Sequence, residues 1–426
     1  MQAFQLLRFG TLLLISIVFT KSKLTTESIG SYEVFLFISA LLCSFWVNGL
    51  IQAFLPLYKN NNTFGVDKKG RSPEIFNAFV LISILSLIAV LALAILKGSI
   101  SAIFTKSGEI PFFNLLLPYI LLSCPAYLVE YIYLLKNKPG WILRYGSITF
   151  FIQFILIAAP AVLGYGMGIC VSGLVSISVV RYIWLIIMLR KYSLPVFSFA
   201  FIREHISYGY PLIISALLGS SAQYVDSFLV LNKFDAATFA IFRYGAKEFP
   251  LVLLIANAFS TAMIPEFSSK EKLYNSLQLL RKRSARLMHL LFPISMAFLL
   301  FSNWLYPVVF NDNFTESARI FNIYLLIIIS RLVFPHTIII GLKKTKIVMY
   351  ASFAELVVNI ILSVIFIHLW GIEGVAFATL IAFAIQKIIW LVYNKIVLRI
   401  PPKEYVPVTF WAIYSLMILI IYYFVY

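Results

Sequence analysis

Lysine and arginine gather in every second loop of this chain, between long apolar segments. The 426 residues are 62% hydrophobic and only 12% charged, which is more apolar than soluble domains usually are. Basic loops remain on the cytoplasmic side of a membrane, so the alternation indicates how the chain is threaded. We therefore predict an all-α polytopic membrane protein whose N-terminus is cytoplasmic.

The apolar segments have the length of membrane-spanning helices. A spanning helix needs roughly 20 mostly apolar residues, and this rule gives about thirteen spans. Helices are expected because lipid cannot hydrogen-bond an open backbone, and the alternating pattern of outer-membrane strands is missing. The predicted spans are residues 5–20, 30–57, 75–97, 111–135, 141–163, 167–189, 206–231, 237–264, 285–310, 318–341, 346–369, 373–397 and 406–426.

The formal net charge is +17. In a soluble protein this excess would suggest nucleic acid as a partner. Here most basic residues lie in the predicted inside loops, so membrane topology explains the excess and no nucleic acid is expected. Attraction to anionic lipid headgroups is a secondary effect.

Two halves of the sequence resemble each other. The differences 374 − 168, 387 − 181 and 390 − 184 all equal 206, and they relate Gly168 to Gly374, Arg181 to Lys387 and Trp184 to Trp390. Six spans in each half give both halves the same orientation, as in parallel repeats about an axis along the membrane normal, around a central cavity. We predict halves at 1–197 and 198–400, with an extra peripheral helix at 401–426.

The sequence lacks the motifs of ATP-driven, metal-dependent and catalytic sites. No Gly-rich phosphate-binding loop with Lys-Ser/Thr is present, so we expect no ATP use and no cofactor. The four histidines are scattered, so we expect no metal site and no catalytic residue. Cys43, Cys124 and Cys170 lie within predicted spans and are expected to be free, buried thiols. The first apolar segment lacks a small-residue cleavage site and is predicted to be an uncleaved helix.

Ionisable residues inside spans are costly, so they are the candidates for function. Arg181 and Lys387 occupy equivalent positions of the repeats. Two cations facing one cavity would suit a diphosphate, because guanidinium binds phosphate bidentately and ammonium acts as a point charge. The alternative interpretation is that both side chains extend to lipid headgroups at the cytoplasmic surface.

A second group lies on the seventh and eighth spans. Gln223 and Asp226 are three residues apart, and Arg243 and Lys247 are four apart, so each pair shares a helix face. Asp226 and Arg243 have similar depth counted from the loop between the spans, and we predict that they pair or share a polar network. Such a network is either a static lock or a charge relay and sugar contact near the outer opening.

Arg331 and Glu355 form the next predicted pair, near the middle of the tenth and eleventh spans. Burial raises the pKa of a carboxyl group, so a carboxylate at this depth suits proton coupling. The alternative is a satisfied ion pair that joins two helices.

Three further residues complete the candidate set. Glu130 lies near the inner surface and is either a helix-end charge or a buried partner of a cation. Asn48 and Gln52 are polar residues in the middle of the second span. They either line the cavity with groups that can hydrogen-bond sugars or join neighbouring helices.

Three short segments resemble one known group of membrane proteins. They are residues 6–10 (Leu-Leu-Arg-Phe-Gly), residues 27–32 (Glu-Ser-Ile-Gly-Ser-Tyr) and residues 208–212 (Tyr-Gly-Tyr-Pro-Leu), the last leading to Asp226. With the two six-span halves, they resemble the polysaccharide branch of the multidrug/oligosaccharidyl-lipid/polysaccharide exporter superfamily, the Wzx-type flippases. The resemblance covers nearly the whole chain except the last span.

The resemblance implies a function and partners. It implies that undecaprenyl-diphosphate-linked oligosaccharide, an O-antigen or capsule precursor, moves to the periplasmic leaflet of a bacterial inner membrane. We expect alternating access driven by an ion gradient, with Asp226 or Glu355 as the titrating group. A polysaccharide polymerase and a chain-length regulator are possible partners. The thirteenth span departs from the usual count of the group and places the C-terminus in the periplasm.

Two other functions stay open. A drug/cation antiporter of the same fold would need a cavity dominated by carboxylates to attract cations. Here the basic residues within the spans, Arg181, Arg243, Lys247, Arg331 and Lys387, outnumber the acidic ones. A membrane polysaccharide polymerase or glycosyltransferase would need a large external loop, and all predicted external loops are short.

Overall fold

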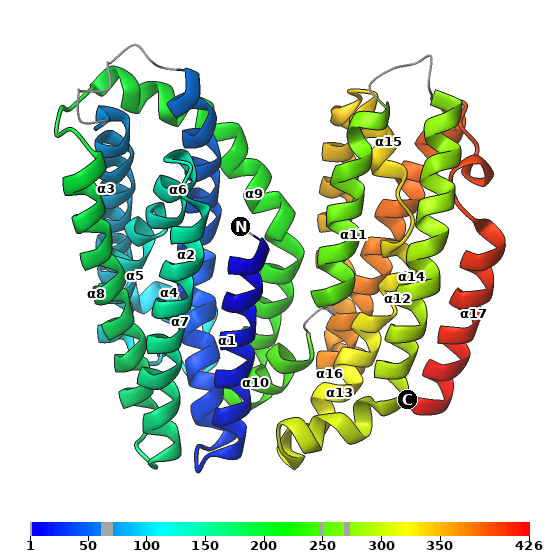
Figure 1. The fold of residues 1–426 in the computed structure, drawn as a ribbon. Coiled ribbons are helices and arrows are strands. Elements are labelled where there is room, and N and C mark those ends of the chain that lie inside the picture. The colour runs from blue at the N-terminus through cyan, green and yellow to red at the C-terminus, as the bar shows by residue number, and fades with distance from the viewer. Residues whose placement is uncertain (1, 61–70, 247–249, 268–272) are drawn as a thin grey trace. The chain divides into compact units, whose positions relative to one another are not determined.

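The computed structural model describes residues 2–60, 71–246, 250–267 and 273–426. The described residues are helical almost throughout (Figure 1), which confirms the predicted all-α class. The chain divides into two compact units: unit 1 is Met1–Ser220 with Leu231–Ala240, and unit 2 is Ser221–Val230 with Ile241–Tyr426. The finer sequence boundaries near residues 197 and 400 stay a prediction.

Unit 1 is a bundle built from long apolar helices. Within it α1 packs on α7, α3 packs on α5, and both α5 and α7 pack on α8. Its helices are α1 (Gln2–Lys21), α2 (Thr26–Asn60), α3 (Pro73–Ile95), α4 (Lys97–Phe104), α5 (Phe113–Ala126), α6 (Leu128–Leu135), α7 (Pro139–Val162) and α8 (Met167–Tyr192); α9 (Phe199–Lys233) and α10 (Ala236–Gly245) contribute residues to both units.

The α7–α8 hairpin of unit 1 is closely packed. A Cβ atom built on Gly173 would lie 2.2 Å from the carbonyl oxygen of Leu156. Only glycine lets two helix backbones approach this closely, and such small-residue contacts drive helix association in lipid, where the hydrophobic effect between helices is absent. The predicted free thiols Cys43, Cys124 and Cys170 are all buried and unbridged in this unit.

Unit 2 contains the remaining helices. Here α13 and α15 pack on α16, and α17 packs along α12 (Figure 1). Its elements after α10 are α11 (Pro250–Met263), η2 (Ile264–Phe267), α12 (Leu273–Val309), η4 (Asp312–Phe314), α13 (Thr315–Leu325), α14 (Ile328–Arg331), α15 (Pro335–Gly341), α16 (Thr345–Ile396), η5 (Pro402–Glu404) and α17 (Val408–Val425).

The 52-residue helix α16 is a hairpin of two arms. Its helical geometry breaks at Trp370 and at Gly371, where φ is +59°. Side-chain hydrogen bonds cross between the arms, among them those from Asn359 to Thr379 (3.0 Å) and from Gln386 to Ser352 (3.2 Å). The midpoint of each of these pairs is residue 369, so the arms run antiparallel from this turn. The arms correspond to the eleventh and twelfth predicted spans.

The count of spanning helices agrees with a multi-pass membrane protein. The described residues hold nine helices that are long and apolar enough to cross a membrane, or up to eleven if each bent pair is one span. Since α16 is one of the nine and contains two predicted spans, this count is consistent with the predicted thirteen. The extra C-terminal span is present as α17.

The basic segment before the ninth predicted span is continuous with that span. Residues 273–286 belong to α12, which runs unbroken for 37 residues. At 1.5 Å per residue this helix is about 55 Å long, longer than a hydrocarbon core of about 30 Å. Its basic N-terminal part can therefore stand beyond the apolar layer without a separate helix.

Candidate functional site

The interior of unit 2 holds a cavity with a cationic wall. Its volume is about 80 Å³, and α11, α14, α15 and the second arm of α16 supply its lining. The polar side chains that line it are Asn257, Arg331, His336, Gln386 and Lys387. Two of these, Arg331 and Lys387, were predicted from the sequence as substrate-binding residues, and the structure brings them to one cavity.

Lys387 is buried within unit 2, with a relative exposure of 7%. Its Nζ donates a hydrogen bond of 3.2 Å to the carbonyl oxygen of Val333 and lies 5.1 Å from the ring centroid of Trp390. The carbonyl is available because the chain breaks between α14 and α15, ahead of Pro335. A broken helix thus supplies a polar backbone group at membrane depth, which is tolerated where it faces protein or a cavity.

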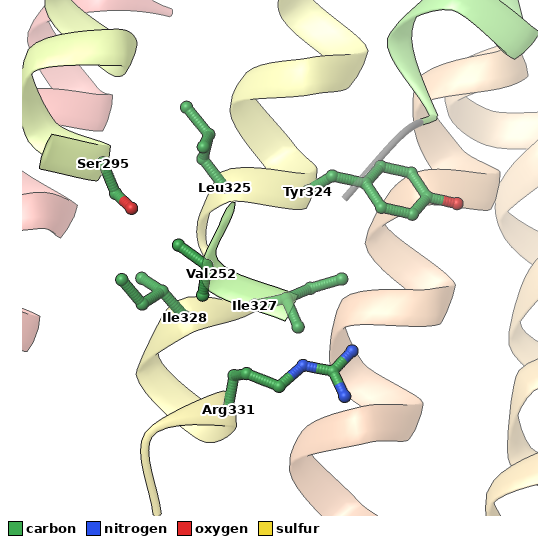
Figure 2. A pocket seen from close by; sticks show the side chains of 7 residues that line it. All are labelled: Val252, Ser295, Tyr324, Leu325, Ile327, Ile328 and Arg331. Atoms are coloured by element: carbon green, nitrogen blue, oxygen red, sulfur yellow. The ribbon is translucent and has the colours of Figure 1, made fainter. Parts of the chain in front are cut away.

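Arg331 closes the short helix α14, and its guanidinium carbon lies 5.1 Å from the ring centroid of Phe383. It also lines a second, much smaller cavity with Tyr324. Figure 2 shows the Arg331 and Tyr324 side chains extending to the same side of this cavity, away from Ser295. Arg331 therefore connects the cationic cavity with the polar groups around Tyr324.

Glu355 lies on the first arm of α16 and accepts a hydrogen bond from Gln386 Nε2 on the second arm. Gln386 lines the cationic cavity, so Glu355 lies just behind this wall. The predicted ion pair between Arg331 and Glu355 stays a prediction. The role of Gln386 was not found from the sequence, because a single glutamine inside an apolar segment carries no distinctive pattern.

Asp226 is the most enclosed acidic candidate, with a relative exposure of 2%. Among the described residues, its hydrogen-bond partners are neutral groups of unit 2: Thr379 Oγ1 (2.5 Å), Asn359 Nδ2 (3.2 Å), Tyr324 OH (3.2 Å) and Ser363 Oγ (3.5 Å). Asp226 therefore lies in a polar network with side chains of α13 and α16. That Arg243 pairs with Asp226 or shares this network stays a prediction.

Unit 1 has its own cluster of buried charge and amide groups. Arg181 Nη2 donates a hydrogen bond of 2.7 Å to Gln153 Oε1, and its guanidinium lies 5.3 Å from the Phe150 ring centroid. Glu130 is buried within electrostatic range of both Arg181 and Arg8. This arrangement favours the interpretation of Glu130 as a buried partner of cations.

Arg8 joins this cluster through Tyr127. Its Nη2 donates a hydrogen bond of 2.8 Å to the Tyr127 hydroxyl. Sequence reasoning did not select Arg8 as a site residue, although it is a charged residue inside the first apolar segment. That position was the signal that could have identified it.

Four other predicted residues lie outside these clusters. Asn48 and Gln52 on α2 and Gln223 on α9 are exposed, and Arg243 is half-buried on α10. The remaining candidate, Lys247, lies outside the described residues. Roles for these five in substrate binding stay predictions.

Solved membrane transporters have a similar fold. The lipid II flippase MurJ in an inward closed conformation matches with a TM-score of 0.74 and 20% identity, covering 100% of this chain and 92% of the other. An inward-facing multidrug resistance MATE family transporter of the MOP superfamily matches at 0.65 and 14%, covering 91% and 94%. A MOP superfamily transporter from Pyrococcus furiosus, whose binding pocket is described as having reverse polarity, matches at 0.57 and 13%, covering 93% of each chain.

Sequence comparison identifies the family. A search of curated protein sequences gave no match. The family model described as polysaccharide biosynthesis protein matches residues 15–319, which is most of the chain. With the fold of the flippases and transporters named above, this multi-pass membrane protein belongs to the polysaccharide biosynthesis protein family.

Proposed function

We propose that this protein moves undecaprenyl-diphosphate-linked oligosaccharide repeat units, the precursors of O-antigen or capsule, from the cytoplasmic to the periplasmic leaflet of a bacterial inner membrane. The observation that carries the proposal is the cavity of unit 2, where Arg331 and Lys387 stand beside amide and imidazole groups. A diphosphate is the part of such a substrate that needs buried cations. The family and the flippase-like fold support a lipid-linked substrate.

The size of the cavity fits one part of the substrate. A volume of about 80 Å³ corresponds to a few water molecules at about 30 Å³ each, which suits a phosphate group and not an oligosaccharide. We assign Arg331 to bidentate phosphate contact and Lys387 to a point-charge contact. Gln386, Asn257 and His336 supply further hydrogen-bonding groups, and Arg181 remains the corresponding candidate of unit 1.

A drug/cation antiporter is the second candidate function, because MATE transporters share the fold. A cationic drug would be repelled by a cavity wall that carries Arg331 and Lys387. The charge of this wall therefore favours an anionic substrate. The remaining predicted binding residues stay in the proposal as further contacts to sugars: Asn48, Gln52, Gln223, Arg243 and Lys247.

Ion coupling at Asp226 is the second part of the proposal. A buried carboxylate without a cationic partner is costly to keep ionised. Among the described residues, only hydroxyl and amide groups bond Asp226, and the amide oxygen of Asn359 is buried without a hydrogen-bond partner. These hard oxygen atoms suit a proton or a small cation such as Na⁺. Glu355 and Glu130 are the other candidate coupling groups.

Topology and partners complete the proposal. The charge pattern of the loops favours a cytoplasmic N-terminus and a periplasmic C-terminus after α17. Alkaline phosphatase fused to each terminus tests this, since the enzyme folds only in the periplasm, and activity at the N-terminus would contradict it. Partners of the transport step would be a polysaccharide polymerase and a chain-length regulator, which act on the exported units.

The experiment that tests the proposed function uses the purified full chain in proteoliposomes. A fluorescent undecaprenyl-diphosphate oligosaccharide is placed in the outer leaflet, and its loss of accessibility to a sugar-modifying enzyme is followed. The proposal expects flipping that depends on Arg331 and Lys387, with no accumulation of an organic cation such as ethidium. Ethidium transport without flipping of the lipid-linked sugar would contradict it and favour the antiporter.

A further inference from the structure

A third cavity of unit 2 lies at the N-terminal end of the α12–α17 contact. Its volume is about 340 Å³. Its main lining residues are Gln278, Arg281, Lys282, Pro407, Thr409 and Phe410. The first three are at positions i, i+3 and i+4 of α12 and so share one helix face, while the last three are the N-cap residue of α17 and two residues of its first turn.

Within the described ranges of the chain, the two cations of this cavity have no carboxylate partner. Arg281 and Lys282 are exposed, and the part of the chain that the structure describes places no carboxylate within 4.0 Å of either side chain. Positive charge at the cytoplasmic end of a span is ordinary and explains why basic residues occur here. It does not explain a cavity beside them with a hydroxyl and an amide group in its wall. The side chains of Arg281, Lys282, Thr409 and Gln278 together present the donors that a phosphate monoanion or diester requires.

Below the cavity, α12 and α17 form a tight seam. The His289 ring Nδ1 and the Tyr414 hydroxyl are 2.9 Å apart, and the Phe292 and Tyr414 rings stack with centroids 5.3 Å apart. Phe410 meets His289 edge to face at 4.7 Å. Phe410 belongs both to the cavity lining and to this seam and is partly exposed, so the cavity adjoins the outer surface of α17.

That outer surface is apolar. Phe410, Ile413 and Met417 follow one another at helical spacing and are exposed, as is Leu290 on the neighbouring α12. Acyl chains would lie along this surface in a bilayer. A molecule with an anionic phosphate and apolar chains would therefore contact Arg281 and Lys282 with its phosphate and the outer surface of α17 with its chains.

We propose that this cavity binds the phosphate headgroup of an anionic phospholipid from the predicted cytoplasmic leaflet, with acyl chains along α17. The basic part of α12 that stands beyond the apolar layer places Arg281 and Lys282 at headgroup depth. The bound lipid joins the peripheral helix α17 to α12. This inference does not depend on the proposed transport function.

Native mass spectrometry of the full chain in detergent tests the proposal, using phosphatidylglycerol and phosphatidylcholine with identical acyl chains. Near an anionic group each basic residue contributes about a fivefold factor to binding. The variant R281Q/K282Q should therefore bind phosphatidylglycerol about 30-fold more weakly than the unmodified chain. The matched control R190Q/K191Q removes two exposed cations at the end of α8 and should leave binding unchanged.

Further measurements distinguish binding of a lipid from binding of free phosphate, and a loss of binding from a loss of folding. Glycerol phosphate and inorganic phosphate at millimolar concentration should not displace the lipid, because they lack acyl chains. Displacement by either would show a phosphate site and overturn the assignment to a lipid. Equal binding of the two lipids, or an equal loss in both double variants, would overturn the proposal. The melting temperature of R281Q/K282Q without added lipid should match that of the control, which shows that weaker binding does not come from unfolding.

Discussion

The hydroxyl of Thr379 donates a hydrogen bond of 2.5 Å to the Oδ2 atom of Asp226, a residue 153 positions away in the chain. The same carboxylate accepts from Tyr324, Asn359 and Ser363. The helix α13 and both arms of α16 thus converge on one acidic group through neutral donors. Because burial makes an ionised carboxylate costly, a group held by neutral donors should respond strongly to a proton or cation that reaches it.

The substitution Asp226→Asn should remove the response of transport to an ion gradient. Asparagine keeps the size of the side chain but binds neither a proton nor a cation at neutral pH. We expect gradient-driven flipping to fall about 100-fold, equivalent to about 2.7 kcal/mol, while flipping without a gradient changes little. Proteoliposomes with an imposed H⁺ or Na⁺ gradient measure both rates and identify the ion.

Thr379→Ser is the matched control for this prediction, since it keeps the hydroxyl that bonds Asp226. It should retain coupling. A D226N protein that still responds to a gradient as the unmodified chain does would rule out Asp226 as the coupling group and leave Glu355 to be tested in the same assay.

Lys387→Gln and Arg331→Gln should each weaken binding of the lipid-linked substrate. Losing one charge-assisted hydrogen bond costs about 1.5–3 kcal/mol, which corresponds to about 10- to 100-fold in apparent affinity. The KM of flipping measures this loss. Lys387→Arg keeps the charge and should recover most of the affinity, whereas Arg331→Lys should recover less because the bidentate geometry is lost. Unchanged KM in both neutral variants would remove the cavity from the proposed site.

Arg181→Ala tests the candidate of unit 1. Removing the Arg181 side chain leaves the buried amide oxygen of Gln153 without its donor. The free energy of unfolding should therefore fall by about 1–3 kcal/mol. If Arg181 and Lys387 contact the same diphosphate, their effects on KM should be non-additive in a double-mutant cycle. Strict additivity, measured against an Arg181→Lys control, would show that the two residues act on separate groups.

The spans were predictable because hydrophobic length and loop charge are properties of the sequence alone. The turn of α16 was also visible, as a gap between the eleventh and twelfth predicted spans. Ionisable residues inside spans could be recognised from the sequence, which identified Asp226, Arg331 and Lys387. Rotation about the helix axis could not be counted, so the sequence did not identify Thr379 as a hydrogen-bond partner of Asp226.

Hydroxyl groups were the main omission at the acidic site. Serine and threonine in helices commonly bond the carbonyl four residues earlier, as Thr149 does to Tyr145 and Ser178 does to Leu174. A hydroxyl within a span is therefore normally satisfied in its own helix, and sequence gives no sign that Thr379 bonds a distant carboxylate. That partnership depends on how the α16 hairpin folds back, which no local pattern encodes.

The pH dependence of stability should include a contribution from Asp235, in the loop before α10. The backbone N–H of Thr238 donates to Asp235 Oδ1 (2.8 Å) and lowers the pKa of this carboxyl below its usual value. A depressed pKa stabilises the folded state above the unfolded-state pKa, and this contribution is lost as pH falls through the folded-state value. Asp235→Ala should cost about 1 kcal/mol at pH 7 and almost nothing at pH 2.

Thermal unfolding in detergent at both pH values measures this difference. Asp235→Asn is the control, because it retains an N-cap acceptor without the titrating charge. The stability of D235N relative to the unmodified chain should vary with pH, because only the unmodified chain carries a titrating group at this position. The asparagine side chain should still accept the capping hydrogen bond at both pH values. A constant difference between D235A and the unmodified chain from pH 7 to pH 2 would contradict a role for the ionised carboxylate.

Gly371→Ala should destabilise unit 2 through the backbone alone. Gly371 has φ +59° and ψ −137°, a combination that side chains with a Cβ atom rarely adopt, and such strain costs about 1–3 kcal/mol. No atom lies within 4 Å of a Cβ built there, so steric contact contributes nothing. Gly98→Ala in α4 is the control, because that glycine also has open space but no positive φ; alanine should stabilise its helix by up to about 1 kcal/mol.

The hairpin turn sets the register between the arms of α16, and with it the position of Thr379 beside Asp226. G371A should therefore lower both the melting temperature and the response to an ion gradient, and a variant that lost neither would show that the turn does not need glycine.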